Sequence, residues 1–511
     1  MSDWTSGYVS DVGYTFGYYQ ELNPLRVKFA FLSAGIAFPA INNVCELGFG
    51  QGLSINIHAA ASTQHWYGTD FNPTQAGFAR ELANASGAHC HLQDSAFEQF
   101  CNDSSLPNFD FIGLHGIWSW VSDENKKIIV DFISRKLNVG GVLYISYNTM
   151  PGWASMVPMR HLLTEHAEVM AAPGRGIIAR IDAAMSFCEQ MLKTNPAFLR
   201  ANPSIKERFD RLKGQNRHYL AHEYFNRDWD PMHFADMQKW LSPAKLSYAC
   251  SAHLLDHIDE LNLTAEQQTL LNDIPDANLR ETIRDFMTNV QFRRDYWVKG
   301  PRRLNRLDQL EAFRELLLVA TKPRDAITLE VQGALGEASL KNPAYVHLVD
   351  ALAENKIWRL GDLEAKLADK GIKINDIIKV AMLLIGKGDL CLAQDAEAIQ
   401  QARPATQKLN DLLMKKTRGS NDLHYLASAV TGGGVMIGAV NQLFTHAFSN
   451  GKNTPQQLAN EVYANFDARG QKLVKSGKEV DSKEEAIKHL NLLAEQFCSE
   501  QLPIFQKLGV L

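Results

Sequence analysis

A glycine-rich segment that follows an apolar run is the strongest chemical signal in the chain. It reads Val44-Cys-Glu-Leu-Gly-Phe-Gly-Gln-Gly-Leu53, and its acid is Glu46. Its glycines are Gly48, Gly50 and Gly52. Glycines allow a tight turn and a close approach of a ligand to the backbone, and a helix start adds N–H donors. Leu53 stands where a dinucleotide-binding loop has its third glycine. Glycine turns also join strands to helices for structural reasons, so this segment alone leaves both interpretations open.

Two acids occur at corresponding places further along the chain. Asp70 closes the run His-Trp-Tyr-Gly-Thr-Asp, and Asp94 follows the run His-Leu-Gln-Asp. Ionised carboxylates only accept hydrogen bonds, so the first can hold two ribose hydroxyls and the second an adenine amine. Each acid alone also fits a helix N-cap, but three features in this order favour a nucleoside site. The prediction includes the neighbours Phe71 and Ser95.

Short apolar runs alternate with helix-like stretches around these residues. The expected strands are Asn43–Leu47, His65–Thr69, His89–Gln93, Phe109–His115 and Val142–Tyr147. Between them lie the expected helices Thr74–Ala85 and Asn125–Leu137. This alternation predicts a parallel sheet with helices on both faces, an α/β fold. Ligands of such sheets bind outside the carboxyl ends of the strands, where the glycines and both acids lie.

The remainder of the chain divides by pattern. Arg217–Phe225 and Lys245–Ser251 are interpreted as the last two strands of the sheet, with a helix over Pro231–Leu241 between them. The predicted units are an α/β domain over 1–256 with a helical insertion at about 158–215, a helical region over 257–330, a winged-helix-like domain over 335–395 and a helical C-terminal domain over 396–511.

Composition narrows the class of protein. The 511 residues are 45% hydrophobic and 21% charged with a net charge of -5, which disfavours a general nucleic-acid or membrane-surface binder. The sequence shows no signal peptide and no apolar stretch long enough to span a membrane. The seven cysteines form no C-x-x-C pair, so we expect reduced thiols, a cytoplasmic location and no metal site.

Together these motifs resemble the class I S-adenosylmethionine-dependent methyltransferases. The glycine segment and two acids carry that resemblance, and further segments resemble bacterial members with a methyltransferase regulatory domain, such as the rickettsial lysine methyltransferases of outer-membrane proteins. Those segments are Leu114-His-Gly-Ile-Trp-Ser-Trp120, Tyr144-Ile-Ser-Tyr-Asn-Thr-Met-Pro-Gly-Trp153, the tyrosine-rich stretch from Tyr14 to Pro24, and Tyr219-Leu-Ala-His-Glu-Tyr224. The resemblance implies a Rossmann-like methyltransferase sheet with S-adenosylmethionine as cofactor.

The resemblance also implies an acceptor, a lysine side chain of a protein, and residues that serve it. His115 is expected to touch the cofactor and to orient the amine or accept its proton, unless it is a structural histidine. The aromatic side chains expected to line the acceptor channel are Trp118, Trp120, Tyr147 and Trp153, although one of the two Trp118 and Trp120 can instead belong to the core. Tyr14 and Tyr18 are expected to close over the methionine part of the cofactor.

Two alternatives stay open from the sequence. A small-molecule methyltransferase would have the same cofactor residues, although some 250 additional residues favour a macromolecular acceptor. A regulatory protein could instead use the winged helix on DNA. Its third helix, Asn375–Gly386, is largely apolar, whereas a recognition helix needs basic and amide side chains. His222 and Glu223 adjoin on an expected strand, so only one of them would face the cleft.

Overall fold

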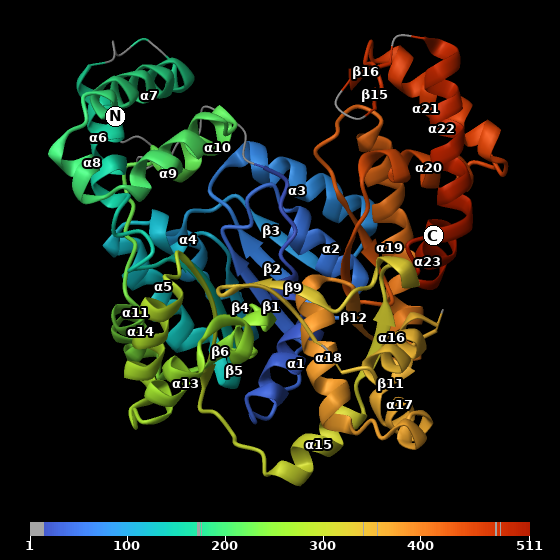
Figure 1. Cartoon of the computed structure of the whole chain (residues 1–511), viewed down its shortest axis with the longest axis horizontal. Helices are drawn as coiled ribbons and strands as arrows, with labels where there is room; N and C mark the ends of the chain where they lie inside the picture. Colours follow the sequence, from blue (N-terminus) through green and yellow to red (C-terminus); the bar gives the residue numbers. More distant parts are fainter. Residues whose placement is uncertain are drawn as a thin grey trace.

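A seven-stranded sheet forms the centre of the chain (Figure 1). The computed structural model describes residues 15–170, 174, 176–340, 342–354, 356–475, 478–480 and 482–511, so Tyr14 lies outside the described residues. The strand order is β3-β2-β1-β4-β5-β7-β6. The strands are β1 (Asn43–Leu47), β2 (His65–Thr69), β3 (Cys90–Gln93), β4 (Phe109–Leu114), β5 (Leu137–Asn148), β6 (Leu246–Ser251) and β7 (Phe292–Lys299). The first five are parallel, as predicted, and β7 runs antiparallel to both of its neighbours.

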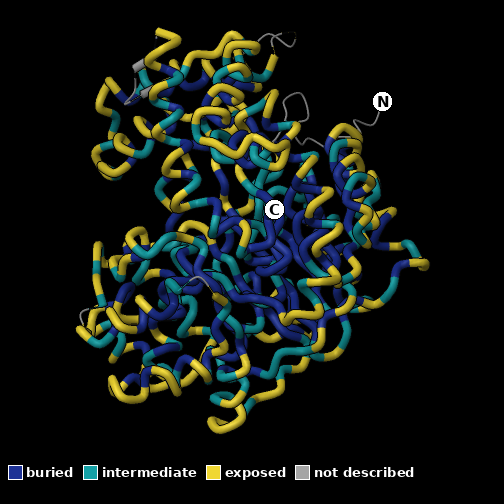
Figure 2. The backbone as a smooth tube through the Cα atoms, turned by 90° about the vertical axis from the view of Figure 1, so that its right-hand side faces the viewer, coloured by how far each residue is buried: buried dark blue, intermediate teal, exposed yellow. Residues whose placement is uncertain are grey.

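Apolar residues alternate between the two faces of this sheet. Val44 and Phe111 belong to one buried cluster, and their neighbours Cys45 and Ile112 belong to another on the opposite face. Helices covering the first face are α1 (Pro24–Ser33), α2 (Leu53–Ala61) and α3 (Pro73–Ser86). The other face carries α4 (Phe97–Cys101), α5 (Asp123–Lys136) and α11 (Phe234–Leu241). Figure 2 shows the buried residues gathered at the centre of the molecule.

The helical insertion forms a separate module beside the carboxyl edge of the sheet, at the upper left of Figure 1. Its helices are α6 (Val157–Val169), α7 (Ile177–Lys193), α8 (Ala197–Ala201), α9 (Ser204–Lys213) and α10 (Arg217–Tyr224). The predicted strand over Arg217–Phe225 is therefore wrong. Asn216 caps a helix there, because its side chain accepts from the N–H of His218, and Leu220 and Tyr224 pack one turn apart into the core of the module.

The strand missing from the prediction is β7, which lies at 292–299 within the region expected to be helical. It pairs with β5 on one side and β6 on the other, so the sheet continues past residue 256, the predicted domain end. Region 257–330 also holds α12 (Asp259–Asn262), α13 (Ala265–Asn272), α14 (Ala277–Thr288), α15 (Arg306–Arg314), β8 (Leu317–Ala320) and the first residue of β9 (Glu330–Gly333).

The predicted winged-helix order of three helices and a strand is present. The elements are β10 (Gly336–Ser339), α16 (Tyr345–Ala353), β11 (Trp358–Arg359), α17 (Leu360–Lys366), α18 (Ile374–Lys387) and β12 (Leu390–Ala393). β11 and β12 flank β8 in a three-stranded sheet. Helix α18 is packed rather than presented to solvent, since Ile377 and Val380 are fully buried. Assignment of this unit as a winged helix stays a prediction.

The C-terminal region is largely helical, as expected, and includes a short hairpin. Its elements are α19 (Ala396–Thr417), β13 (Tyr425–Ser428), β14 (Gly433–Met436), α20 (Ala439–Ser449), α21 (Pro455–Ala468), β15 (Val474–Lys475), β16 (Lys478–Glu479), α22 (Lys483–Gln496) and α23 (Leu502–Lys507). Helix α19 lies against α2 and α3, and the hairpin β13–β14 lies against α2 (Figure 1). Within the described ranges, no helix is both long and apolar enough to cross a membrane.

Candidate functional site

A cavity of about 470 Å³ opens at the carboxyl ends of β1, β2 and β4. It lies where the parallel sheet predicts a ligand site. Eight predicted site residues line it: Gly48, Gly50, Gly52, Asp70, Phe71, Ser95, His115 and Trp120. Of the remaining predicted residues, Tyr14 lies outside the described residues, and Tyr18, Glu46, Asp94, Trp118 and Tyr147 lie elsewhere.

The glycine segment forms the floor of the cavity. Gly48, Gly50 and Gly52 all have positive φ values of 72°, 57° and 70°, a region that glycine enters without steric cost. A Cβ added at Gly52 would lie 2.3 Å from the Cβ of Ala79 on α3. A Cβ at Gly48 would lie 2.5 Å from the side chain of Ile117. The segment therefore needs glycine both for its turn and for close packing.

Asp70 closes β2 and holds the glycine segment in place. One carboxylate oxygen accepts from the Gly50 N–H at 2.9 Å, and the other accepts from the Asn72 N–H at 3.0 Å. Burial raises the pKa of Asp70 to about 6, although both backbone donors oppose the shift. The side chain lines the cavity and keeps lone pairs for further donors.

Asp94 does not occupy the place predicted for it. Its side chain is 47% exposed and accepts from Arg80 at 2.7 Å, on the outside of the molecule. The following residue, Ser95, lines the cavity instead. The chain turns at the end of β3 so that Arg80 of α3 attracts the carboxylate outward.

Glu46 is the most unusual carboxylate near the site. It is 1% exposed, and neither of its oxygens finds a hydrogen-bond partner among the described residues. Burial, with a smaller contribution from the charge of Asp70, raises its pKa to about 8. Its charge also acts on Tyr19, which lines the cavity, so the carboxyl lies just behind the cavity wall. A buried carboxylate without partners is costly, and a cation that enters the cavity would relieve that cost.

His115, at the end of β4, lines the cavity and is held from two sides. Its ring stacks on Tyr19 with centroids 3.5 Å apart, and its Nδ1 hydrogen-bonds the Tyr144 hydroxyl at 2.8 Å. Burial lowers the pKa of His115 to about 4, so the imidazole is neutral at physiological pH. A neutral, fixed imidazole orients a polar group well and is a weak base.

Tyr19, and not the predicted Tyr18, is the tyrosine at the cavity. Tyr19 lines the cavity, whereas Tyr18 packs away from it, between His58 of α2 and Tyr425 of β13. The chain has no helical structure at this point, and neighbouring side chains of an extended segment point in opposite directions. The prediction chose Tyr18 and missed its neighbour.

Of the four aromatic residues predicted for the acceptor channel, only Trp120 lines the cavity. Trp118 is fully buried below it and donates to the sulfur of Met232 at 3.4 Å. The expectation that one of the two tryptophans belongs to the core is thus met. Tyr147 is also buried and donates to Asp295, and Trp153 packs in the core of the helical module.

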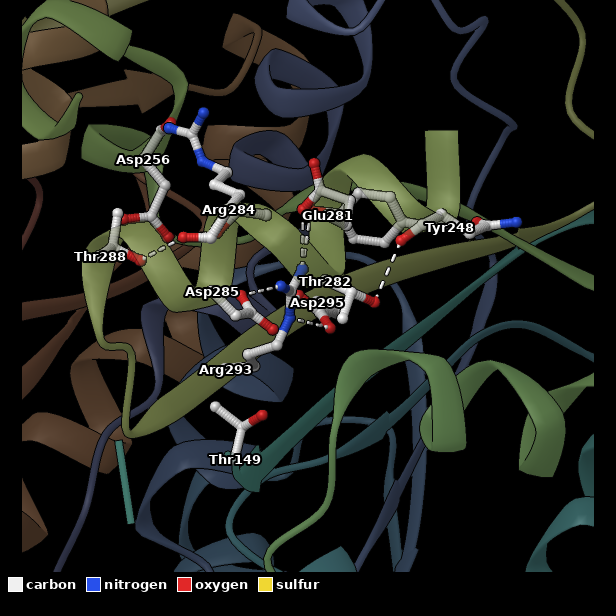
Figure 3. Close-up of polar contacts among 12 residues, drawn as sticks. Thr149, Tyr248, Asp256, Glu281, Thr282, Arg284, Asp285, Thr288, Arg293 and Asp295 are labelled. Carbon is white, nitrogen blue, oxygen red and sulfur yellow. Dashed lines mark hydrogen bonds and ion pairs between the residues drawn. The ribbon is translucent and has the colours of Figure 1, made fainter. Parts of the chain in front are cut away.

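A cluster of buried charges explains the position of Tyr147. Figure 3 shows Arg293 of β7 between Asp285, Glu281 and Asp295, with Tyr248 as a further partner. These bonds fasten α14 to the outer strands of the sheet. The Tyr147 hydroxyl donates a hydrogen bond to Asp295 at 2.9 Å. It therefore belongs to this cluster and does not face the cavity.

The mouth of the cavity holds charged residues, of which the sequence analysis considered only Glu223. Acidic side chains at the mouth are Glu98 of α4, Glu124 of α5, and Glu223 and Asp228 in and after α10. Among the described lining residues, Arg227 is the one arginine or lysine that accompanies these four carboxylates. His222 and Glu223 both line the cavity, since α10 is a helix and not the expected strand. The 3.6-residue spacing of Leu220 and Tyr224 was the signal that could have revealed this.

In the described part of the chain, no group of three or more histidine, cysteine or acidic side chains is placed to hold a metal ion. All seven cysteines are free thiols.

Comparison with known proteins agrees with this geometry. The model of the family described as "Predicted methyltransferase regulatory domain" matches residues 216–299, from α10 through β7. The chain is 38% identical to the uncharacterized protein sll1526 of Synechocystis over 99% of both chains. It is 23% identical to the uncharacterized protein RP789 of Rickettsia prowazekii, over 95% of this chain and 91% of that protein.

A solved structure shares the fold over the whole chain. The structure of PKMT2 from Rickettsia typhi in complex with AdoHcy matches with a TM-score of 0.70 at 17% identity, and it covers 97% of this chain and 100% of that one. The predicted α/β fold class is confirmed. The chain belongs to the family of Synechocystis sll1526, shares the fold of the PKMT2 structure, and matches the methyltransferase regulatory domain over residues 216–299.

Proposed function

We propose that this protein transfers methyl groups from S-adenosylmethionine to lysine side chains of a protein. The single observation that carries the acceptor class is the mouth of the cavity, where four carboxylates and Trp120 surround the entrance and Arg227 is the one arginine or lysine among the described lining residues. A cationic side chain with an aliphatic stem suits both the negative charge and the aromatic surface. The cofactor supplies an electrophilic methyl group on a sulfonium.

The residues of the cavity fit this cofactor. The glycine segment offers backbone close to the ligand, and Asp70 offers carboxylate lone pairs for the ribose hydroxyls. Glu46, which does not line the cavity, adds support from behind its wall, because its buried carboxyl lacks a partner among the described residues and the cofactor carries an ammonium group. A carboxylate at this position disfavours an anionic ligand group, such as the pyrophosphate of a dinucleotide, because like charges repel.

The walls around His115 favour loss of charge from the acceptor amine. Lysine must react as a neutral amine, so it needs desolvation and a route for its proton. His115 is neutral and buried, and Tyr19 and Trp120 add aromatic surface beside it. In the proposal, His115 orients the amine and the proton leaves toward the carboxylates at the mouth or to water.

The helical module of α6–α10 supports a macromolecular acceptor. The module lies beside the carboxyl edge of the sheet (Figure 1). Its helix α10 contributes Glu223 to the lining of the cavity. A polypeptide can contact this module while one of its side chains enters the cavity. A small acceptor would use the same mouth without needing the module.

The test is transfer of labelled methyl groups from S-adenosylmethionine to a cell lysate, followed by mass spectrometry of the labelled proteins. The proposal expects methyl increments on lysine. Trp120→Ala should lower kcat for such a substrate while leaving cofactor affinity near that of the wild type, because Trp120 lies at the mouth. The Asp94→Ala variant, altered at an exposed ion pair outside the cavity, is the matched control.

Label found only in small molecules would support a small-molecule methyltransferase instead. Label confined to glutamine, arginine or a nucleic acid would refute the lysine acceptor. Absence of S-adenosylmethionine binding by calorimetry would refute the proposal as a whole.

A further inference from the structure

Residues Thr15–Tyr19, here called the N-terminal strap, cross the cavity in an alternating arrangement. Thr15, Gly17 and Tyr19 line the cavity. Phe16 and Tyr18, between them, pack instead against the buried cluster shared by α2 and the C-terminal region. Alternation of this kind is what an extended chain between two surfaces requires. The strap is thus one wall of the cavity and also the link to a distant part of the sequence.

The hairpin β13–β14 forms the surface against which the Tyr18 side chain packs, here called the seat of Tyr18. A Cβ added at Gly433 would lie 2.4 Å from the Tyr18 hydroxyl oxygen, and one at Gly434 would lie 2.8 Å from its ring. Tyr425 faces the same ring at 4.9 Å between centroids. These glycines are therefore needed for close approach of a side chain that lies more than four hundred positions earlier. Nothing in the sequence of the hairpin alone would suggest this.

Further contacts fix the strap and its continuation to the same region. Asn23, which caps α1, donates to the Thr431 carbonyl at 2.9 Å. The backbone of Tyr19 is held by α2, since its N–H donates to Ser54 at 3.1 Å and its carbonyl bonds His58 Nε2 at 3.0 Å. Tyr18 also contacts His58, with ring centroids 5.0 Å apart. Displacement of Tyr18 would therefore shift the residue that follows it.

That following residue is Tyr19, which stacks on His115 in the cavity. We infer that the C-terminal hairpin is a positioning element for the cofactor site: Gly433 and Gly434 seat Tyr18, and Tyr18 sets Tyr19 and the strap over the cavity. This assigns the C-terminal region a part in binding S-adenosylmethionine. The inference rests on the cofactor of the proposed function and is independent of the acceptor.

The test uses the full-length chain and S-adenosylhomocysteine as the probe, with calorimetry for Kd and thermal unfolding for Tm. Gly434→Ala should weaken binding by roughly tenfold at a temperature where the variant is folded, a typical coupling between residues in contact. Gly438→Ala is the matched control, because it follows the same hairpin and a Cβ there meets nothing within 4 Å. Its Kd should equal that of the wild type.

A double-mutant cycle separates positioning from general damage. Tyr18→Leu should weaken binding by itself, and Gly434→Ala added to it should cause little further loss, because the ring that the new methyl group meets is gone. Tyr18→Phe, which keeps the ring, should stay sensitive to Gly434→Ala and covers the case in which the leucine variant does not fold. Full additivity in the Tyr18→Leu cycle, loss of the Gly434→Ala effect in the Tyr18→Phe background, or wild-type affinity in folded Gly434→Ala would overturn the inference. Failure of the wild type to bind the probe would instead overturn the proposed cofactor.

Discussion

The two ends of the cavity are built differently. The backbone of the glycine segment lines one end, and side chains line the mouth at the other end. Gly48, Gly50 and Gly52 come from one short segment, and Asp70 secures it through the Gly50 N–H. The mouth takes residues from α4, α5 and α10, which together span more than a hundred positions of the chain. A backbone wall depends on a few positions that accept no substitution, whereas a side-chain wall can change its charge without loss of the fold. Four predictions test this contrast.

The largest effect is expected for Gly52→Ala at the backbone end. The new Cβ would collide with Ala79 and occupy a φ of 70°, so the glycine segment must shift as a unit. We expect S-adenosylhomocysteine binding to fall by about a hundredfold or more, since both strain and misplacement act on the same contacts. Calorimetry measures the Kd for S-adenosylhomocysteine. Gly87→Ala is the control for strain alone, because Gly87 also has a positive φ and a Cβ added there meets nothing within 4 Å. Equal losses in both variants would contradict the close-packing argument.

Asp70→Ala should have the next largest effect. It removes an acceptor from the cavity and releases the glycine segment, at a cost of about 1–3 kcal/mol in cofactor binding. Asp94→Ala should change the Kd by less than about twofold, because that carboxylate is exposed and paired only with Arg80. If Asp94→Ala proved the more damaging of the two, the sequence-based assignment of Asp94 to the adenine would be restored.

Glu46 predicts a pH dependence with a definite sign. Its folded-state pKa of about 8 lies above the ordinary 4.5, so the empty protein loses stability as pH rises between these values. The affinity for the cofactor should change in the opposite direction. It should rise several-fold from pH 6 to pH 8, because the ammonium group of the cofactor favours the ionised form of Glu46. Calorimetry in buffers of different ionisation enthalpy should detect proton release on binding at pH 7. Glu46→Gln should abolish the release and both pH dependences; if the release persists, another group is responsible.

The smallest effect is expected at the mouth. Replacing exposed Glu98 and Glu124 together by glutamine should raise KM for a basic peptide by about two- to fivefold, with kcat little changed. The difference should shrink with added salt, because exposed charges are screened. Glu337→Gln, an exposed site on β10, is the control for a change of net charge. A large fall in kcat would show that these carboxylates act on the reacting amine and not on approach alone.

The contrast between the two ends also explains which predictions succeeded. The glycine segment, Asp70, Phe71 and Ser95 lie directly after predicted strands, so local order places them at one edge of the sheet. Trp118 and Trp120 were indistinguishable by pattern. Only the turn after β4, which buries the first against Met232, selects the second for the cavity.

The amino-acid sequence by itself determined the parallel sheet, the glycine turn and the acid that secures it, because strand periodicity and turn chemistry act over a few residues. Tertiary structure alone decided that β7 is a strand, since Arg293 is buried there with carboxylates that α14 supplies, in addition to Asp295 of its own strand. It likewise decided that Tyr19 and not Tyr18 faces the cavity, because the C-terminal hairpin supplies the seat for Tyr18. Contacts between residues far apart in the chain leave no local pattern from which they could be predicted.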